Sequence, residues 1–142
     1  MTNPIPFSTV EQSIQGRFDE IASMIPEQPA VSDKTISLSY RELQKASNKM
    51  AHAILGILGP GKGNIAVFSE NNVYQVIAIL GIVRSGRSYV ALDLDFPEER
   101  NKAILDDSQC RMVICTAEHS KTLSGFCGDR FIISADRLNS NI

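Results

Sequence analysis

The eighteen residues 83–100, VRSGRSYVALDLDFPEER, constrain the possible fold more than any other stretch of the chain. A helix that stops at Gly86 leads into an apolar strand at residues 89–92, and Pro97 then opens a second helix. We expect this strand to be buried, because four mainly apolar residues in a row suit the interior of a sheet. The stretch therefore predicts a helix, strand and helix in direct succession, which is the repeating unit of an α/β protein.

The rest of the chain continues this alternation. Short continuous apolar runs are typical of strands buried on both faces of a parallel sheet, and apolar residues at helical spacing separate them. Such an order predicts a doubly wound, mainly parallel sheet flanked by helices. The expected strands are residues 65–68, 89–92, 112–115 and 131–133, and the expected helices are residues 73–86, 97–107 and 118–124.

An N-terminal helix and a small hairpin precede this core. Apolar spacing predicts a helix over residues 13–24, and two short extended runs flank a polar turn at Asp33 and Lys34. Ser39 and Glu42 then form a capping box for a long helix that stops at Gly59. Because no linker divides these parts, we expect one domain over residues 1–142, with residues 136–142 as a loose tail.

Charge and hydropathy exclude several classes of partner. The 14 basic and 16 acidic residues give a net charge of −2, with no basic run that would favour nucleic acid or an anionic membrane. The longest apolar run, residues 76–83, is far shorter than the ~20 residues of a membrane span. The first residues lack the pattern of a secretory signal, so we expect a cytoplasmic location.

The cysteines agree with that location. Cys110, Cys115 and Cys127 are odd in number, and their spacings match neither a CxxC pair nor a zinc site. Reduced thiols are therefore expected, with Cys115 in a core strand.

A glycine-rich stretch resembles a phosphate-binding loop but fails its requirements. Residues 56–63 nearly spell GxxxxGK[ST], yet glycine stands at position 63 where a hydroxyl should hold magnesium. The stretch also joins a helix to a strand, whereas phosphate binding needs backbone amides at a helix N-terminus. It predicts the end of a helix rather than a nucleotide site. No GxGxxG follows a strand, which removes the usual argument for a dinucleotide.

Few other side chains suggest chemistry. Asp93 and Asp95 follow a predicted strand, where a magnesium or general-base role is conceivable, but capping by Asp95 and bonding of loop amides by Asp93 are favoured. His52 is expected to be a packing or boundary residue, and His119, beside Glu118, a solvated one. The residues alone thus predict an α/β scaffold with no catalytic, cofactor-binding or metal-binding residue.

Two motifs suggest a family. Residues 38–43, LSYREL, followed by Ser47 and Ala51, resemble the LTYxEL…AxxLA motif of adenylate-forming enzymes, specifically the amino-acid-activating domains of nonribosomal peptide synthetases. Residues 86–100 resemble their second motif, KAGxAYVPIDPxYPxER. The matching residues of the second motif are Gly86, Tyr89, Val90, Leu92, Asp93, Phe96, Pro97, Glu99 and Arg100. Asp93, in place of asparagine, favours the amino-acid-activating branch over acyl-CoA ligases.

The chain also departs from the family pattern. Ala91 and Leu94 stand where the family usually has proline, and Glu70 and Asn71 replace the usual arginine and serine after the first core strand. These enzymes are several times longer, and no residue here matches their phosphate loop, their amine-binding and ribose-binding aspartates or their C-terminal lysine. The resemblance therefore implies an incomplete N-terminal subdomain.

The implied parent enzyme makes an aminoacyl-AMP from ATP and an amino acid, with magnesium, and passes it to a carrier-protein pantetheine thiol. We expect this chain alone to be inactive, and its partners to be the remainder of the domain and a carrier protein. The alternative is a non-catalytic α/β module that binds a protein.

Overall fold

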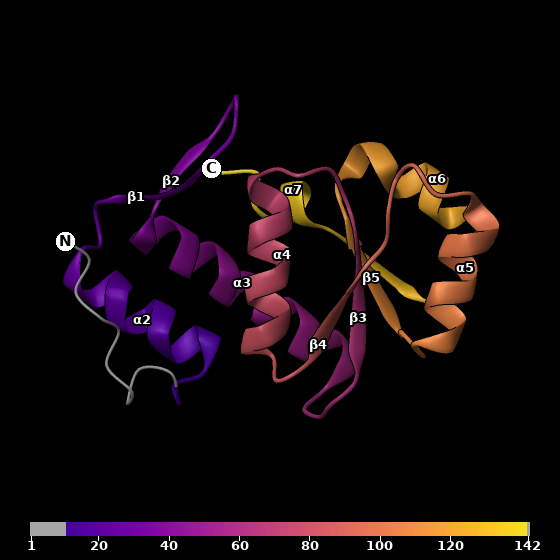
Figure 1. The fold of residues 1–142 in the computed structure, drawn as a ribbon, viewed down its shortest axis with the longest axis horizontal. Coiled ribbons are helices and arrows are strands. Elements are labelled where there is room, and N and C mark those ends of the chain that lie inside the picture. Colours follow the sequence, from indigo (N-terminus) through magenta and orange to yellow (C-terminus); the bar gives the residue numbers. More distant parts are fainter. Residues whose placement is uncertain (1–10, 142) are drawn as a thin grey trace.

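A parallel sheet of four strands forms the centre of the computed structural model, which describes residues 11–141 (Figure 1). In sheet order the strands are β4 (Ser88–Ala91), β3 (Asn64–Phe68), β5 (Met112–Cys115) and β6 (Phe131–Ser134). All neighbouring pairs are parallel. Since β3, the first of these strands along the chain, lies inside the sheet, the chain winds outward from it in both directions. This order confirms the predicted doubly wound parallel sheet.

Helices cover both faces of the sheet (Figure 1). On one side α3 and α4 share a core with the sheet and α7, and α2 packs outside α3 and α4. On the other side α5 and α6 cover a second core. The bounds are α2 (Ile14–Met24), α3 (Tyr40–Leu58), α4 (Val73–Arg84), α5 (Glu98–Asp107), the 3₁₀ turn η1 (Ala117–His119), α6 (Ser120–Ser124) and α7 (Ala135–Leu138).

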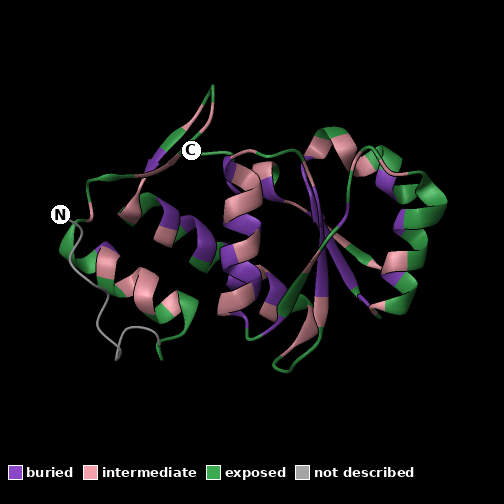
Figure 2. Ribbon diagram, in the orientation of Figure 1, coloured by how far each residue is buried: buried purple, intermediate pink, exposed green. Residues whose placement is uncertain are grey.

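Burial follows the position of each strand (Figure 2). The central strands β3 and β5 are buried along almost their whole length, as their continuous apolar runs predict. By contrast, β4 is an edge strand of the described sheet, and Tyr89 is 47% exposed. The prediction of a buried strand at residues 89–92 is therefore wrong for the strand itself, because no described strand covers its outer edge. Leu92, immediately beyond β4, is buried.

The long helix α3 begins and ends where the sequence predicts. The Ser39 hydroxyl accepts a hydrogen bond from the Glu42 amide at 3.2 Å, and the Glu42 carboxylate accepts one from the Ser39 amide at 2.8 Å. This is a complete capping box. At the other end, Gly59 has φ +72°, a backbone conformation that favours glycine.

Helices α3 and α4 approach each other closely at Gly81 of α4. A Cβ atom at Gly81 would overlap the side chain of Met50, and it would lie 3.3 Å from the Ser47 carbonyl oxygen. Met50 itself is fully buried. The absence of a side chain at position 81 is therefore required for this packing.

A polar network ties α2 to the other two helices of this side. The Arg84 guanidinium donates hydrogen bonds to both carboxylate oxygens of Asp19, at 2.5 and 3.2 Å, and to the Ser47 hydroxyl at 2.9 Å. Gln44 also donates to Asp19, at 2.8 Å. The hydrogen bonds from Arg84 lower the pKa of Asp19, even though partial burial opposes the shift.

The hairpin is formed by β1 (Pro29–Ser32) and β2 (Ser37–Ser39), which pair in antiparallel fashion around the predicted turn. In this turn the Asp33 carboxylate accepts hydrogen bonds from the amides of Thr35, Ile36 and Val73. The bond from Val73 is the largest cause that holds the pKa of Asp33 well below its usual range. Asp33 thus joins the hairpin turn to the first residue of α4.

The C-terminal residues differ from the expected loose tail at 136–142. Residues 135–138 form α7, which packs against α4, and Ala135 and Asn139 are buried. The Asp136 carboxylate accepts a hydrogen bond from the Ala117 amide at 2.9 Å. The segment therefore has packing partners after all, because the end of β6 brings it beside α4 and η1. Residue 142 lies outside the described residues.

The length and hydropathy of the helices determine whether any of them could span a membrane. Over residues 11–141, no helix has both the length and the apolar composition needed to cross a bilayer.

Candidate functional site

The carboxyl ends of the strands define the edge at which ligands bind in doubly wound sheets. Because β3 and β5 are neighbours and the winding direction changes between them, this point is the expected ligand crevice. Residues 69–72 follow β3 and residues 116–119 follow β5. The segment that follows β4 carries Asp93 and Asp95.

Asp93 has the structural role that the sequence favours. Its carboxylate accepts a hydrogen bond from the Asp95 amide at 2.9 Å. The buried side chain of Asn101 makes two hydrogen bonds with the backbone of Asp93. Its Nδ2 donates to the Asp93 carbonyl at 2.8 Å, and its Oδ1 accepts from the Asp93 backbone N–H at 3.3 Å. Asp93 therefore shapes the turn between β4 and α5.

Asp95 does not cap α5, so that prediction is wrong. The helix begins at Glu98, its N-cap residue is Pro97, and no side chain caps it. A capping side chain comes from the residue directly before the first helical one, and Asp95 lies two positions too early. Pro97 fixes the backbone at this point in its place. Glu98 and Glu99 occupy the first turn, as predicted.

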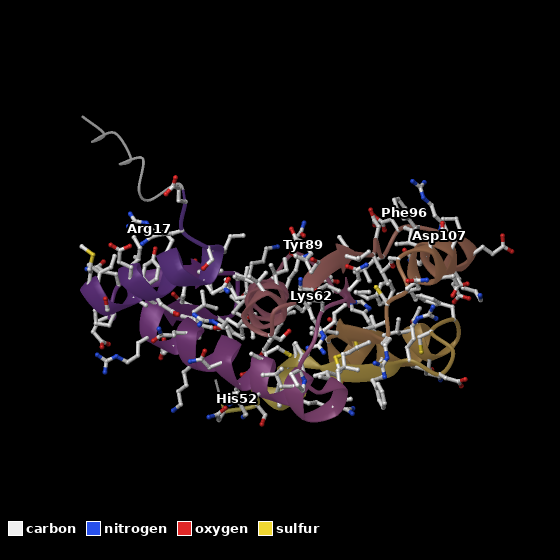
Figure 3. All side chains as sticks on the ribbon, turned by 90° about the horizontal axis from the view of Figure 1, so that it is seen from below. Arg17, His52, Lys62, Tyr89, Phe96 and Asp107 are labelled. Carbon is white, nitrogen blue, oxygen red and sulfur yellow. The ribbon has the colours of Figure 1, made fainter. Side chains whose placement is uncertain are left out.

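The two histidines both differ from expectation. His52 is exposed on the outer side of α3, not at a packing boundary (Figure 3). His119 is not fully solvated, because only 19% of its side chain is exposed and its ring meets Phe68 edge-on, with 5.8 Å between the ring centroids. In each case tertiary packing determines how exposed the histidine side chain is, and local sequence patterns do not encode that packing.

The three cysteines are free and buried, which agrees with reduced thiols. Burial raises the pKa of Cys115 to about 11, and it also raises the pKa of Cys110. Protonated, buried thiols are poor nucleophiles, so these two groups are packing residues. Cys115 lies in β5, as predicted.

The glycine-rich residues 56–63 lie at the opposite end of the sheet from the ligand edge. They connect the end of α3 to the start of β3, and Figure 3 labels Lys62 in this connection. The Gly59 carbonyl accepts a hydrogen bond from Arg87 at 2.7 Å. Because no helix starts after this loop, its amides form no phosphate cradle, and the reading of these residues as a helix stop is confirmed.

A groove of about 630 Å³ lies between β2, α3 and the residues after α7. Lys45 and Lys49 line it one helical turn apart, together with Asn139. Among its described lining residues the single acid is Glu42, which the capping box already uses. The groove therefore carries no acid–base pair. The sequence gives little sign of it, because its walls come from segments about 100 residues apart.

One group of side chains at the ligand edge has the composition of a metal site. Glu70 follows β3, and Glu118 and His119 lie in η1 after β5. One potential ligand atom from each of the three residues lies within 4.8 Å of the other two. No local sequence pattern predicts this group. The order of the strands brings position 70 beside positions 118 and 119.

The chain belongs to the family of AMP-binding enzymes, because the model described as "AMP-binding enzyme" matches residues 18–137. It is 33% identical over 129 residues to the nonribosomal peptide synthetase sirP of Leptosphaeria maculans. That alignment covers 91% of this chain and 6% of sirP, so the chain spans only a small share of this relative. The resemblance inferred from the two motifs is confirmed.

Solved structures agree on the fold. The α-methyl-L-serine-AMP bound form of the nonribosomal peptide synthetase FmoA3 matches with a TM-score of 0.79 and 24% identity, over 86% of this chain and 14% of FmoA3. NpsA-ThdA, an artificially fused adenylation–PCP di-domain from Klebsiella oxytoca, matches with a TM-score of 0.74 and 22% identity, over 87% of this chain and 24% of the fusion. At these identities the likeness establishes the architecture, which is that of the N-terminal subdomain of adenylate-forming enzymes.

Proposed function

We propose that this chain is the N-terminal part of an amino-acid adenylation domain. In the complete enzyme, the carboxylate of an amino acid would attack the α-phosphorus of ATP and release pyrophosphate. The thiol of a carrier-protein pantetheine would then attack the carbonyl carbon of the aminoacyl-AMP and release AMP. The observation that carries this proposal is the pair of motifs at residues 38–43 and 86–100, both inside the family match at residues 18–137.

Both motifs have an architectural role in this chain. In the first, Ser39 and Glu42 cap α3, and the Tyr40 ring packs against Phe18 with 5.7 Å between the ring centroids. In the second, Asp93 shapes the turn before α5, and the Arg100 guanidinium lies over the Phe96 ring, 3.9 Å from its centroid. We infer that the chain supplies scaffold, and that the groups which act on substrate belong to the rest of the complete enzyme.

ATP and magnesium are assigned to the complete enzyme and not to this chain. The glycine-rich residues 56–63 do not fit a nucleotide, because they connect a helix to a strand at the amino end of the sheet. No step of the reaction is therefore assigned to a residue described here. We infer that the chain alone is inactive.

The proposed partners are the remainder of the adenylation domain and a carrier protein. The first is supported by the small share of sirP and FmoA3 that the chain spans. The second is supported by NpsA-ThdA, which joins an adenylation domain to a PCP. A cytoplasmic location remains part of the proposal, supported by the three free, buried cysteines.

The first test is amino-acid-dependent exchange between ATP and pyrophosphate. We expect no exchange by the 142-residue chain, and exchange with a defined amino acid by the complete domain that carries this sequence. Exchange by the chain alone would contradict its inactivity. Failure of the complete domain with every amino acid tried would contradict the adenylation proposal itself.

The second candidate is a non-catalytic α/β module that binds a protein. Exposed aromatic side chains on both edge strands fit it, because Tyr89 of β4 and Phe131 of β6 are each 47% exposed, but an incomplete domain would leave such side chains uncovered as well. Reading the DNA past codon 142 separates the candidates. A TSGTTGxPKG-like continuation supports the adenylation domain, whereas a stop codon with no complementing neighbour supports the module.

A further inference from the structure

We propose that Glu70, Glu118 and His119 together bind a divalent transition-metal ion, and that zinc matches their donor atoms best. The three side chains lie where the winding direction of the sheet changes. Phe68, the last residue of β3, is aligned with Cys115, the last residue of β5, in the parallel pairing. The residues that follow these two strands are therefore neighbours in space, at the edge where doubly wound sheets bind ligands.

His119 is held in place as a potential ligand. Its amide donates a hydrogen bond to the Thr116 carbonyl at 3.0 Å, which closes η1. The Asp136 carboxylate anchors the same turn through the Ala117 amide. Phe68 fixes the plane of the ring, and Phe68 is itself packed edge-on against Phe126. A rigid ring loses little conformational freedom when it binds a ligand.

The Nε2 atom of His119 lacks a partner among residues 11–141. It is screened from solvent and makes no hydrogen bond there. Oε1 of Glu118 lies 3.7 Å from it, which is too long for a hydrogen bond. A buried nitrogen without a partner is costly, and a metal ion between the imidazole and the carboxylate would satisfy it.

The separations fit a metal ion after small movements. Zinc lies about 2.0 to 2.2 Å from imidazole nitrogen and carboxylate oxygen, so tetrahedral ligand atoms are about 3.4 Å apart. The separation of His119 Nε2 from Glu118 Oε1 is already close to this value, at 3.7 Å. All three ligand atoms lie within 4.8 Å of one another. Glu70 and Glu118 are exposed, so each carboxylate can move by about 1 Å through side-chain rotation alone.

Donor type and charge select the kind of ion. Two carboxylates balance the double charge of a divalent cation, and the imidazole favours a transition metal over magnesium or calcium, which prefer oxygen ligands. Three protein ligands leave the remaining positions to water. Glu70 also stands where the family pattern has arginine, so the local charge is reversed in favour of a cation.

The test is titration of the 142-residue chain with zinc ions in a calorimeter. We expect one zinc ion per chain. Glu70→Gln, Glu118→Gln and His119→Asn should each weaken binding by at least about tenfold, since loss of even an indirect supporting group costs that much. His52→Asn and Glu99→Gln are matched controls, because they remove an exposed imidazole and an exposed carboxylate elsewhere, and they should bind zinc as the unaltered chain does.

A second measurement locates the ion. Substoichiometric manganese(II), which is paramagnetic, should broaden the ring proton signals of His119 and leave those of His52 sharp. If His119→Asn fails to fold because the contact with Phe68 is lost, the two glutamine variants still decide the question, since their side chains are exposed. Absence of zinc binding, binding unchanged in both glutamine variants, or broadening at His52 instead of His119 would each overturn the proposal.

Discussion

The two faces of the sheet are built differently, although the same strands contribute to both. Among residues 11–141, the cluster beneath α3, α4 and α7 contains sixteen buried residues, and the cluster beneath α5 and α6 contains ten. The first face has a capping box, a close contact at Gly81 and a network around Arg84. The second face has an uncapped helix of ten residues and a helix of five. We infer that the first face carries most of the stability.

The largest expected difference between the faces comes from truncation of their central side chains. Ile77 and Leu105 are both fully buried, one on each face. We expect Ile77→Ala to lower the free energy of unfolding by about 4 kcal/mol and Leu105→Ala by about 2 kcal/mol, because the cost depends on how far a site can collapse around the cavity. Urea unfolding measures both. Equal losses would show that the smaller cluster is packed as rigidly as the larger one.

A smaller effect is expected from overpacking the contact between α3 and α4. Gly81→Ala should destabilise the chain by about 2 kcal/mol, because the added Cβ overlaps Met50 and has little room beside the Ser47 carbonyl. Gly56→Ala is the matched control, since it adds the same atom to a helix where nothing lies within 4 Å. We expect that control to be neutral or stabilising by up to about 1 kcal/mol. Similar losses in both variants would refute the close contact.

The network at Arg84 should make the stability of the first face depend on pH. Asp19→Asn should cost about 1 kcal/mol at pH 7, a modest value because the Asp19 side chain is 42% exposed. The pKa of Asp19 is lowered in the folded state, so its contribution is present above the unfolded pKa near 3.8 and is lost as the pH falls through the folded pKa.

The measurement for this prediction is urea unfolding of both proteins at several pH values. The difference in free energy of unfolding between the unaltered chain and Asp19→Asn should shrink as the pH drops below about 4. A difference that stays constant down to the acid limit would mean that the ionised form of Asp19 contributes nothing. Glu20→Gln, a neighbouring exposed acid in α2, is the control and should change little.

The smallest expected effect compares the starts of one helix from each face. Ser39→Ala should cost about 1 kcal/mol, because it removes a hydrogen bond that caps α3. Asp95→Ala should change the free energy of unfolding by less than about 0.5 kcal/mol, because Asp95 does not cap α5. Thermal or urea unfolding measures both. If Asp95→Ala lowers the free energy of unfolding as much as Ser39→Ala does, then Asp95 caps α5 after all, as the sequence predicts.

The features that the sequence predicts correctly are those that depend on neighbouring residues. The capping box at Ser39, the helix stops at Gly59 and Gly86, and the central apolar strands all follow from local patterns. The family follows from two short motifs at fixed separation. None of these patterns depends on contacts between segments that are far apart in the sequence.

The features that it misses depend on contacts between distant segments. The exposure of β4 follows from the order of the strands, and the packing of α7 depends on its contacts with α4 and η1, which lie far from it in the sequence. The burial of His119 depends on Phe68, which lies 51 residues earlier in the chain. The grouping of Glu70 with Glu118 likewise requires that β3 and β5 be neighbours, and no local pattern records this.

The turn at Asp33 has a consequence for hydrogen exchange with deuterated solvent. Val73 is the first residue of α4, so its amide has no acceptor within the helix and would exchange rapidly in an isolated helix. Here that amide is bound at 3.0 Å by a carboxylate forty residues earlier. The exchange rate of one amide in the middle of the chain therefore reports how often the hairpin opens.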